Sequence, residues 1–273
     1  MPVRDTFELD DKTTWPDDVL AFMAEHDELF TARQKWEQAS QRRYDEEHKA
    51  GRYTPQAHRS TNPHDALCNC SLDVLVRILK GHKIKAWHCT RLTPAEQEVI
   101  AATGMSLPNP TTLHARISQL VNSGELSNDM AERLLNKNQA DEANRVGMIW
   151  FVLDRPGLRD EMGVGDLFRL WGGEALYNSH DGDSQTGPLL RRIGVPCIVE
   201  AVLPVVDLGN VDAIARKMVD TDLANRGVKD RFGVGHGDRT RKVVPASDIF
   251  AVIPFADPRF LAMTSCEGWD LGE

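Results

Sequence analysis

The sequence contains no long apolar run, and none of its stretches approaches the about 18 consecutive apolar residues of a membrane-spanning helix. The opening segment, MPVRDTFELDD, also lacks the apolar core of a secretion signal. Five cysteines form an odd and sparse set, which does not suit the disulfide framework of a secreted domain. We therefore expect a reduced, cytoplasmic protein with no membrane partner.

An excess of basic residues is also missing, because 32 Lys and Arg stand against 41 Asp and Glu, for a net charge of −9. This balance excludes broad electrostatic binding to nucleic acid, which needs a basic face, but it leaves room for a local basic cleft. The acidic side chains near the start are typical of a solvated face: Asp5, Glu8, Asp10, Asp11, Asp17 and Asp18.

The chain is long enough, at 273 residues, for one large domain or one domain with an appendage. Apolar spacing predicts helix over 15–50, and the turn-rich segment 51–65 suits a linker. We therefore expect a helical N-terminal extension over 1–65 and a main domain over 66–273.

Helices and strands mix irregularly in the main domain. The predicted helices are 71–80 with Ser71 as its cap, 93–104 with a Thr93–Glu96 capping box, 111–122, 127–137 and 211–227. The predicted strands are 84–92, 147–154, 196–208 and one or two within 241–255, while 163–181 is ambiguous. This order favours an α+β fold with a split or two-part sheet over a doubly wound sheet.

The stretch AWHCTRL, residues 86–92, carries polar side chains in an apolar strand. Because a strand alternates its faces, His88 and Thr90 point to one side, and Trp87, Cys89 and Arg91 point to the other. Buried polar groups need partners, so the pair predicts either a core histidine with internal hydrogen bonds or part of a binding site.

A second candidate is Glu174 in FRLWGGEALY, residues 168–177. A carboxylate in such an apolar setting is costly to desolvate, as is typical of a working acid or base. Gly172 and Gly173 allow a ligand to approach the backbone closely. The alternative is a glutamate that begins a helix after a glycine turn.

The glycine-rich stretch DRFGVGHGDRTRK, residues 230–242, does not match a phosphate-binding loop, because no Lys-Ser or Lys-Thr pair follows its glycines. We expect either a loop that contacts a ligand or a flexible surface hairpin.

Two further readings concern cysteine chemistry. Cys68, Cys70, His82, His88 and Cys89 include the ligand types that zinc prefers, but Cys-x-Cys is not the usual zinc spacing. Cys89 is also a candidate nucleophile, although nothing beside it in the sequence marks an activated thiolate. We expect no metal site.

WHCTRLTPAEQEVIAATGM resembles the first motif of the ADP-ribosyltransferase superfamily, in the branches that carry histidine in this motif. Trp87-His88-Cys89-Thr90 matches the aromatic-His-x-Thr strand, and Ile100 to Met105 matches the Ile-x-x-x-Gly-Leu ending of the helix that follows. The later strands 147–154 and 196–205, and the ending VVPASDIFAVIPF, fit in outline, so that the resemblance spans roughly residues 84–256. It implies an ADP-ribosyltransferase-like split β-sheet core.

The resemblance implies that NAD is the co-substrate. His88 would contact the adenosine-side ribose, with Thr90 and Arg91 beside it in the cofactor site. A middle aromatic residue would stack on the nicotinamide, and Trp171 and Tyr177 are the expected residues, with Phe168 as an alternative. The last stretch resembles the closing strands of bacterial toxin members that modify nucleic acid.

The family's catalytic glutamate usually lies on a late strand, but HGDRTRKVV contains no Glu. We therefore assign the catalytic carboxylate to Glu174, together with His88, and keep Glu200 and Asp238 as alternatives. The implied activity is mono-ADP-ribosylation of RNA, DNA or protein, as in a toxin or anti-phage effector. The alternatives are an NAD glycohydrolase and a non-catalytic binding module on the same fold.

Two regions are expected to contact macromolecules. Residues 1–65 would regulate the site or bind a regulatory or antitoxin partner. The basic side chains that would border a cleft for nucleic acid or pyrophosphate are Arg191, Arg192, Arg239 and Arg241.

Overall fold

The computed structural model describes residues 6–51, 61–230 and 235–271. It divides into two compact units, which are described separately. We call Met1–Lys83 with Asn210–Phe232 the helical unit, and Ile84–Gly209 with Gly233–Glu273 the sheet unit. This division differs from the expected boundary after residue 65. Most of the expected linker, residues 52–60, lies outside the described residues.

The helical unit contains β1 (Thr6–Phe7), a short 3-10 turn (Lys12–Thr14), α1 (Asp17–Glu25), α2 (Asp27–Lys49), α3 (Asp65–Leu79) and α11 (Val211–Asn225). α3 packs against α1, α2 and α11. The carboxylate of Asp222 on α11 is buried and pairs with both Lys12 and Arg226. The ion pair between Lys12 and the buried Asp222 links the 3-10 turn to α11.

Two helix predictions in this unit were wrong in their boundaries. The helix predicted over 15–50 is two helices, because α1 ends at His26, whose Nδ1 lies 3.0 Å from the carbonyl oxygen of Phe22. α3 begins at Asp65, so that Ser71 is a buried residue inside the helix and not its cap. α11 agrees with the prediction and ends shortly before Gly227, which has a φ of +70°.

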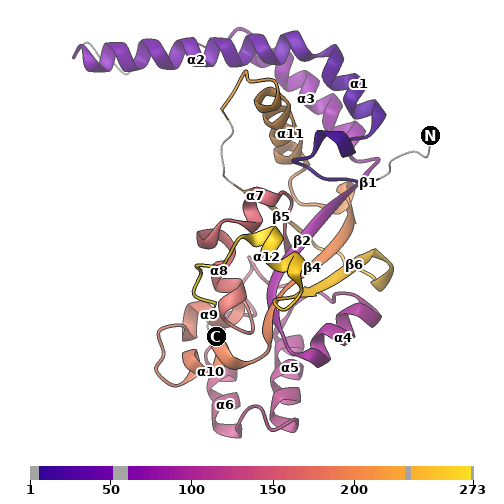
Figure 1. The fold of residues 1–273 in the computed structure, drawn as a ribbon, viewed down its shortest axis with the longest axis vertical. Helices are drawn as coiled ribbons and strands as arrows, with labels where there is room; N and C mark the ends of the chain where they lie inside the picture. Colours follow the sequence, from indigo (N-terminus) through magenta and orange to yellow (C-terminus); the bar gives the residue numbers. More distant parts are fainter. Residues whose placement is uncertain (1–5, 52–60, 231–234, 272–273) are drawn as a thin grey trace. The chain divides into compact units, whose positions relative to one another are not determined.

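The sheet unit is built on strands in the order β5-β3-β2-β4-β6 (Figure 1). Their bounds are β2 (Lys83–Leu92), β3 (Ile149–Val152), β4 (Val195–Pro204), β5 (Gly237–Thr240) and β6 (Ile249–Pro254). The pairs β2–β3, β3–β5 and β4–β6 are antiparallel. The chain is therefore a mixed fold with an open antiparallel sheet, and the expected α+β class agrees with it at this level.

β5 lies inside the stretch that was expected to be a loop, residues 230–242, so that expectation was wrong for 237–240. It pairs with β3, and Phe151 faces Asp238 across the ladder. Residues 231–234 of the same stretch lie outside the described residues. In the predicted strand region 241–255, the strand covers only β6, after a 3-10 turn over Ala246–Asp248.

The helices of the sheet unit are α4 (Pro94–Thr103), α5 (Pro110–Asn122), α6 (Asn128–Asn136), α7 (Arg155–Leu158), α8 (Glu161–Arg169), α9 (Glu174–His180), α10 (Thr186–Arg192) and α12 (Pro258–Thr264). α4, α5 and α6 confirm the predicted helices, and the ambiguous segment 163–181 holds most of α8 and all of α9. None of the helices described is long and apolar enough to cross a membrane.

Two apolar cores stabilise this unit. One covers a face of the sheet and includes Trp87 and Cys89 of β2, Phe168 of α8 and Phe260 of α12. The other joins α5 and α6 to Trp171 and to the following helices α9 and α10. Because Trp87 and Cys89 face the first core, the alternate residues of β2 face the opposite side of the sheet.

Candidate functional site

A cavity of about 740 Å³ lies within the sheet unit, on the side of β2 opposite Trp87 and Cys89. β2 supplies His88, Thr90 and Leu92 to its lining, and α4 and α5 supply side chains that include Glu96 and Arg116. Residues of the 104–108 segment, Met148 with the start of β3, and residues 243–245 complete the lining. Three segments that are distant in sequence thus surround the motif that contains His88.

His88 and Thr90 lie together on the cavity side of β2, as the strand alternation predicted. Nδ1 of His88 is 2.9 Å from the carbonyl oxygen of Trp150 on β3. A carbonyl only accepts hydrogen bonds, so Nδ1 carries the proton and donates it, and Nε2 of the neutral ring is an acceptor. The hydrogen bond to β3 therefore fixes which nitrogen can accept from a bound molecule.

The pKa of His88 lies below its ordinary value. Burial is the main cause because it disfavours the charged ring, and the positive charge of Arg116 acts in the same direction. The hydrogen bond to Trp150 opposes the shift without cancelling it. The imidazole is therefore neutral near pH 7 and can act as a hydrogen-bond acceptor or a weak base.

Glu96, Arg116 and Trp171 form a connected cluster beside His88, which we call the Glu96 cluster. Arg116 donates through Nε to Oε1 of Glu96 at 2.6 Å, and the indole N–H of Trp171 donates to Oε2 at 3.0 Å. The guanidinium carbon of Arg116 also lies 4.6 Å from the ring centroid of Trp171. The three side chains thereby hold one another in place.

The pKa of Glu96 is lowered although burial acts to raise it. The charge and hydrogen bond of Arg116, the backbone N–H of Thr93 and the indole of Trp171 together outweigh the burial. Glu96 is therefore ionised at neutral pH, and both of its oxygens are engaged.

The sequence identified Glu96 only as half of a capping box, which the structure confirms with both of its hydrogen bonds. Its position on the cavity was missed, as was Arg116. The helix predicted over 93–104 begins directly after the strand that carries His88, so its first turn lies beside the end of that strand. This proximity was the signal in the sequence that could have placed Glu96 near His88. No sequence spacing pointed to Arg116, which lies on the following helix.

Gly104 holds one wall of the cavity close to α4. It has a φ of +84°, and a Cβ there would lie 2.0 Å from the carbonyl oxygen of Val244. Met105 and Val244 exchange two backbone hydrogen bonds of 2.8 and 3.0 Å beside it. A side chain at 104 would push the 243–245 segment away, so the motif's glycine is required for this contact.

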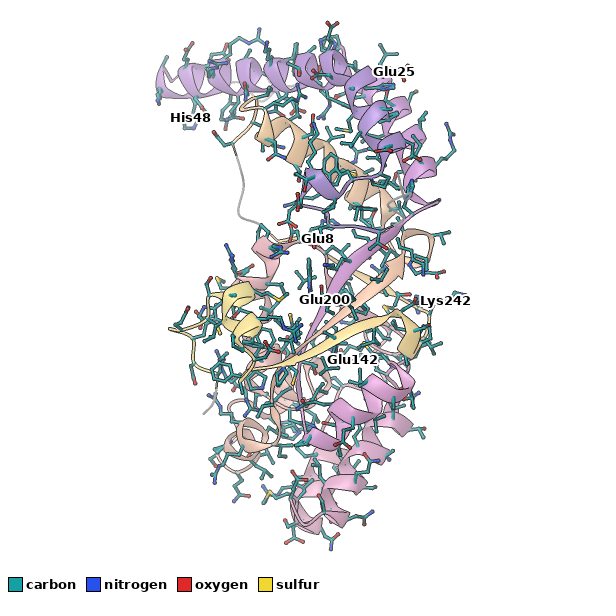
Figure 2. All side chains as sticks on the ribbon, turned by 45° about the vertical axis from the view of Figure 1, so that its right-hand side comes forward. Glu8, Glu25, His48, Glu142, Glu200 and Lys242 are labelled. Carbon is teal, nitrogen blue, oxygen red and sulfur yellow. The ribbon has the colours of Figure 1, made fainter. Side chains whose placement is uncertain are left out.

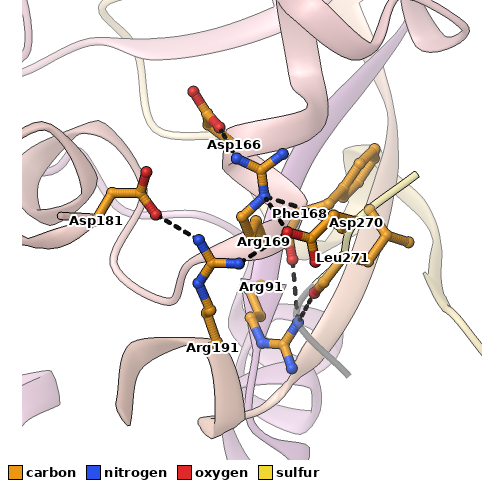
Figure 3. Close-up of polar contacts among 8 residues, drawn as sticks. All are labelled: Arg91, Asp166, Phe168, Arg169, Asp181, Arg191, Asp270 and Leu271. Carbon is orange, nitrogen blue, oxygen red and sulfur yellow. Dashed lines mark hydrogen bonds and ion pairs between the residues drawn. The ribbon is translucent and has the colours of Figure 1, made fainter. Parts of the chain in front are cut away.

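Arg91 lies away from the cavity, and its guanidinium is used inside the protein (Figure 3). Its Nε donates to the carbonyl of Ile193 at 2.8 Å, and Nη1 donates to the carbonyls of Phe168 and Leu271. The residue is buried. The structure thus places Arg91, an expected cofactor ligand, where it ties the C-terminal ends of α8 and α10 and the C-terminal segment to β2.

The expected aromatic residues do not line the cavity among the described residues. Trp171 is fully buried behind it and reaches it only through the Glu96 cluster. Tyr177 packs against the apolar core that joins α5 and α6 to α9 and α10, and burial raises the pKa of its hydroxyl. Phe168 belongs to the core on the other face of the sheet.

Glu174 is the first residue of α9 and follows Gly172 and Gly173, both with positive φ. Its Oε2 lies 3.4 Å from Nε of Arg145, and the side chain is partly exposed. It does not line the cavity, so Glu174 and His88 are not brought together there. This placement corresponds to the alternative of a helix-starting glutamate after a glycine turn.

The two alternative carboxylates lie on opposite faces of the sheet. Glu200 of β4, labelled in Figure 2, pairs with Lys85 at 3.1 Å. Lys85 shares its side of β2 with Trp87 because the two are alternate residues of the strand. Asp238 is buried on β5 and is paired in register with Phe151, whose ring centroid is 5.8 Å from that of His88. Asp238 therefore shares the sheet face of His88.

Several of the basic residues expected at a cleft have other contacts. Arg191 pairs with Asp181 at 2.8 Å and with Asp270 at 3.0 Å, and neighbouring Arg169 pairs with Asp166 (Figure 3). Arg239 lies over the ring of Trp150, with a separation of 5.1 Å. Together with Arg192 and Arg241, these arginines do not line the cavity.

The cysteine readings find little support in the described part of the chain. No group of three or more His, Cys, Asp or Glu side chains within it is arranged to hold a metal ion. Cys89 is buried, and burial raises the pKa of its thiol, which is the opposite of what a thiolate nucleophile requires.

Comparison with known proteins gives no relative: no protein-family model matches the chain, and neither a curated protein nor a solved structure matches it. Function is therefore inferred from the cavity and from the motif around His88.

Proposed function

We propose that the cavity binds NAD and that the protein transfers the ADP-ribose moiety of NAD to an acceptor. The observation that carries this proposal is that His88 and Thr90, the polar residues of the ADP-ribosyltransferase-like motif, open together onto one cavity. Its volume of about 740 Å³ falls within the roughly 300–1,000 Å³ of small-molecule sites. The strand that carries the motif lies in the middle of the sheet, between β3 and β4.

The reaction breaks the bond between nicotinamide and its ribose and forms a bond from the ribose carbon to a nucleophilic atom of the acceptor. Nicotinamide leaves with the bonding electrons, and the acceptor loses a proton. Positive charge develops on the ribose, as in glycoside cleavage. Nε2 of neutral His88 would accept a hydrogen bond from a ribose hydroxyl, and the hydroxyl of Thr90 would orient the same sugar.

A carboxylate must stabilise the developing charge, and the geometry favours Asp238 over Glu174 and Glu200 for this role. Asp238 shares a sheet face with His88, and Phe151 lies between them in the ladder. Two strand spacings of about 4.8 Å place His88 and Asp238 roughly 10 Å apart. Of the three carboxylates, Asp238 alone lies on the sheet face of His88, whereas Glu200 is on the opposite face and Glu174 is paired with Arg145.

A second candidate is a binding module that holds NAD without cleaving it. Glu96 is the one acidic residue among the described residues that line the cavity, and both of its oxygens already accept hydrogen bonds. A carboxylate engaged in this way is poorly placed to stabilise a new positive charge. This candidate predicts NAD binding without release of nicotinamide.

Labelled NAD distinguishes the two candidates. The purified protein is incubated with NAD labelled in the adenylate part and with mixed cellular RNA, DNA and protein. Label transferred to one of these fractions supports a transferase and identifies the acceptor, as expected of a toxin or anti-phage effector. Free ADP-ribose indicates a glycohydrolase, and bound but intact NAD indicates the binding module.

The His88→Ala variant should lose the NAD turnover that the wild-type protein shows, and the His114→Ala variant should keep it. His114 is a suitable control because it is exposed on α5 and does not line the cavity. Equal turnover by both variants, with both shown to be folded, would contradict the assignment of His88 to the site.

A further inference from the structure

Arg116 is held in a fixed orientation at the cavity by two neighbouring side chains. Its Nε donates to Glu96 at 2.6 Å, and its guanidinium lies over the indole of Trp171. Trp171 is fully buried, and only 13% of the Glu96 side chain is exposed, so both supports are themselves fixed by packing. A guanidinium held on two sides loses little conformational freedom when it binds a further group.

Most of the hydrogen-bonding capacity of Arg116 is unused within the described residues. A guanidinium has five N–H donors, and Arg116 donates only through Nε there. Its Nη2 is buried and has no hydrogen-bond partner. A buried donor without an acceptor is unfavourable, and Nη1 also donates to no described residue, so an acceptor that reaches the guanidinium would stabilise the site. The side chain keeps 32% exposure, so a ligand can reach it.

The charges of the cavity favour an anion at this position. Among the described lining residues, Arg116 is the one permanent cation, and most of the others are apolar. Glu96 does not fully neutralise it, because the carboxylate also accepts from the backbone N–H of Thr93 at 2.8 Å and from Trp171. A planar guanidinium in a largely apolar site matches the paired oxygens of a phosphate group.

We propose that Arg116 forms an anion subsite of this cavity and that it binds the diphosphate of a nucleotide. This inference rests on the proposed function, since it names the group on NAD that anchors the dinucleotide near His88. The Glu96 cluster then has a defined role. Glu96 and Trp171 are positioning residues that present Arg116 to the diphosphate, and they do not touch the reacting ribose.

Calorimetric titration with ADP and with adenosine tests the subsite, because the two probes differ only by the diphosphate. The wild-type protein should bind ADP more tightly than adenosine. Arg116→Gln should weaken ADP binding by about tenfold or more and leave adenosine binding within about twofold. Arg133→Gln is the matched control, because Arg133 is exposed on α6 and away from the cavity; it should change neither affinity.

Two additional measurements apply if Arg116→Gln does not fold. Arg116→Lys keeps the charge but not the planar fork, so it should bind ADP more weakly than the wild type and more tightly than adenosine. Inorganic pyrophosphate should also compete with ADP for the wild-type protein. Failure of the wild type to bind ADP, equal losses of ADP and adenosine affinity in Arg116→Gln, or equal ADP affinity in wild type and Arg116→Lys would each overturn the subsite.

Nicotinamide release from NAD, measured on the same samples, separates this inference from the proposed function. ADP binding that depends on Arg116, without any nicotinamide release by the wild type, supports the subsite and contradicts the transferase. Release with the same KM for NAD in wild type and Arg116→Gln supports NAD chemistry and overturns the subsite.

Discussion

The indole N–H of Trp171 donates to Oε2 of Glu96 at 3.0 Å and thereby joins the turn between α8 and α9 to the first turn of α4. Seventy-five positions separate the two residues in the chain. The same Glu96 caps α4 and accepts from Arg116 at the cavity. One carboxylate therefore couples a helix terminus, a buried tryptophan and the cation of the cavity.

Trp171→Phe should destabilise the protein by about 1–2 kcal/mol, because it removes a buried donor to a charged acceptor while keeping an aromatic ring. Trp150→Phe is the control, since Trp150 is 43% exposed and its indole N–H makes only a long bond of 3.4 Å to the carbonyl of Asn144. Its effect should be about 0.5 kcal/mol or less. Urea unfolding measures both, and equal losses would contradict a special role for the Glu96 contact.

Gly104→Ala should destabilise the protein more than Gly124→Ala does. Both glycines have positive φ, +84° and +77°, so both substitutions incur backbone strain of roughly 1–2 kcal/mol. Only the Cβ at 104 meets another atom, at 2.0 Å from the carbonyl of Val244, whereas nothing lies within 4 Å of a Cβ at 124. The clash should add about 1–3 kcal/mol. Equal free energies of unfolding would show that the 243–245 wall moves freely.

Substitution of the carboxylates one at a time tests the catalytic assignment. Asp238→Asn should lower kcat for nicotinamide release by about a hundredfold or more, because it removes the charge that stabilises the ribose. Glu174→Gln should leave kcat within about threefold, since Glu174 begins α9 and pairs with Arg145, whereas Asp238 lies on the sheet face of His88. Glu200→Gln should instead lower the free energy of unfolding, because it removes the ion pair with Lys85. Loss of activity in Glu174→Gln alone would instead restore the assignment made from the sequence.

His88 should make the protein less stable as the solution becomes acidic. The pKa of His88 in the folded protein lies below its ordinary value of 6.5, so between those two values the unfolded chain binds a proton that the folded chain does not. The free energy of unfolding should therefore fall as the pH drops from about 7.5 to about 5.5, and His88→Gln should reduce that fall. An unchanged or larger fall in the variant would contradict a neutral His88.

Local patterns predicted the central strand and its flanking helix well. Alternation placed His88 and Thr90 on one face of β2, and Thr93 and Glu96 gave the start of α4. Both features depend on residues within a few positions of one another. The same reasoning failed at His26, where α1 ends and α2 begins, and at Ser71, which lies six residues inside α3.

The composition of the site was less predictable because it depends on long-range contacts. Arg116 reaches the cavity from a second helix, and its neighbour Trp171 comes from a turn much later in the chain. Glu174 was selected for its apolar surroundings in sequence, yet its apolar neighbours pack into a core while its carboxylate turns toward Arg145. Arg91 shows the same limit, since its three carbonyl partners come from distant segments.

NAD titration followed by the ring signals of His88 in an NMR spectrum tests the central claim most directly. The assignment of these signals comes from their loss in His88→Gln, and His114 provides an exposed reference in the same spectrum. If the cavity binds NAD, the His88 signals should shift in a saturable way while those of His114 stay in place. NAD that leaves the His88 signals unchanged at saturating concentration would contradict the account.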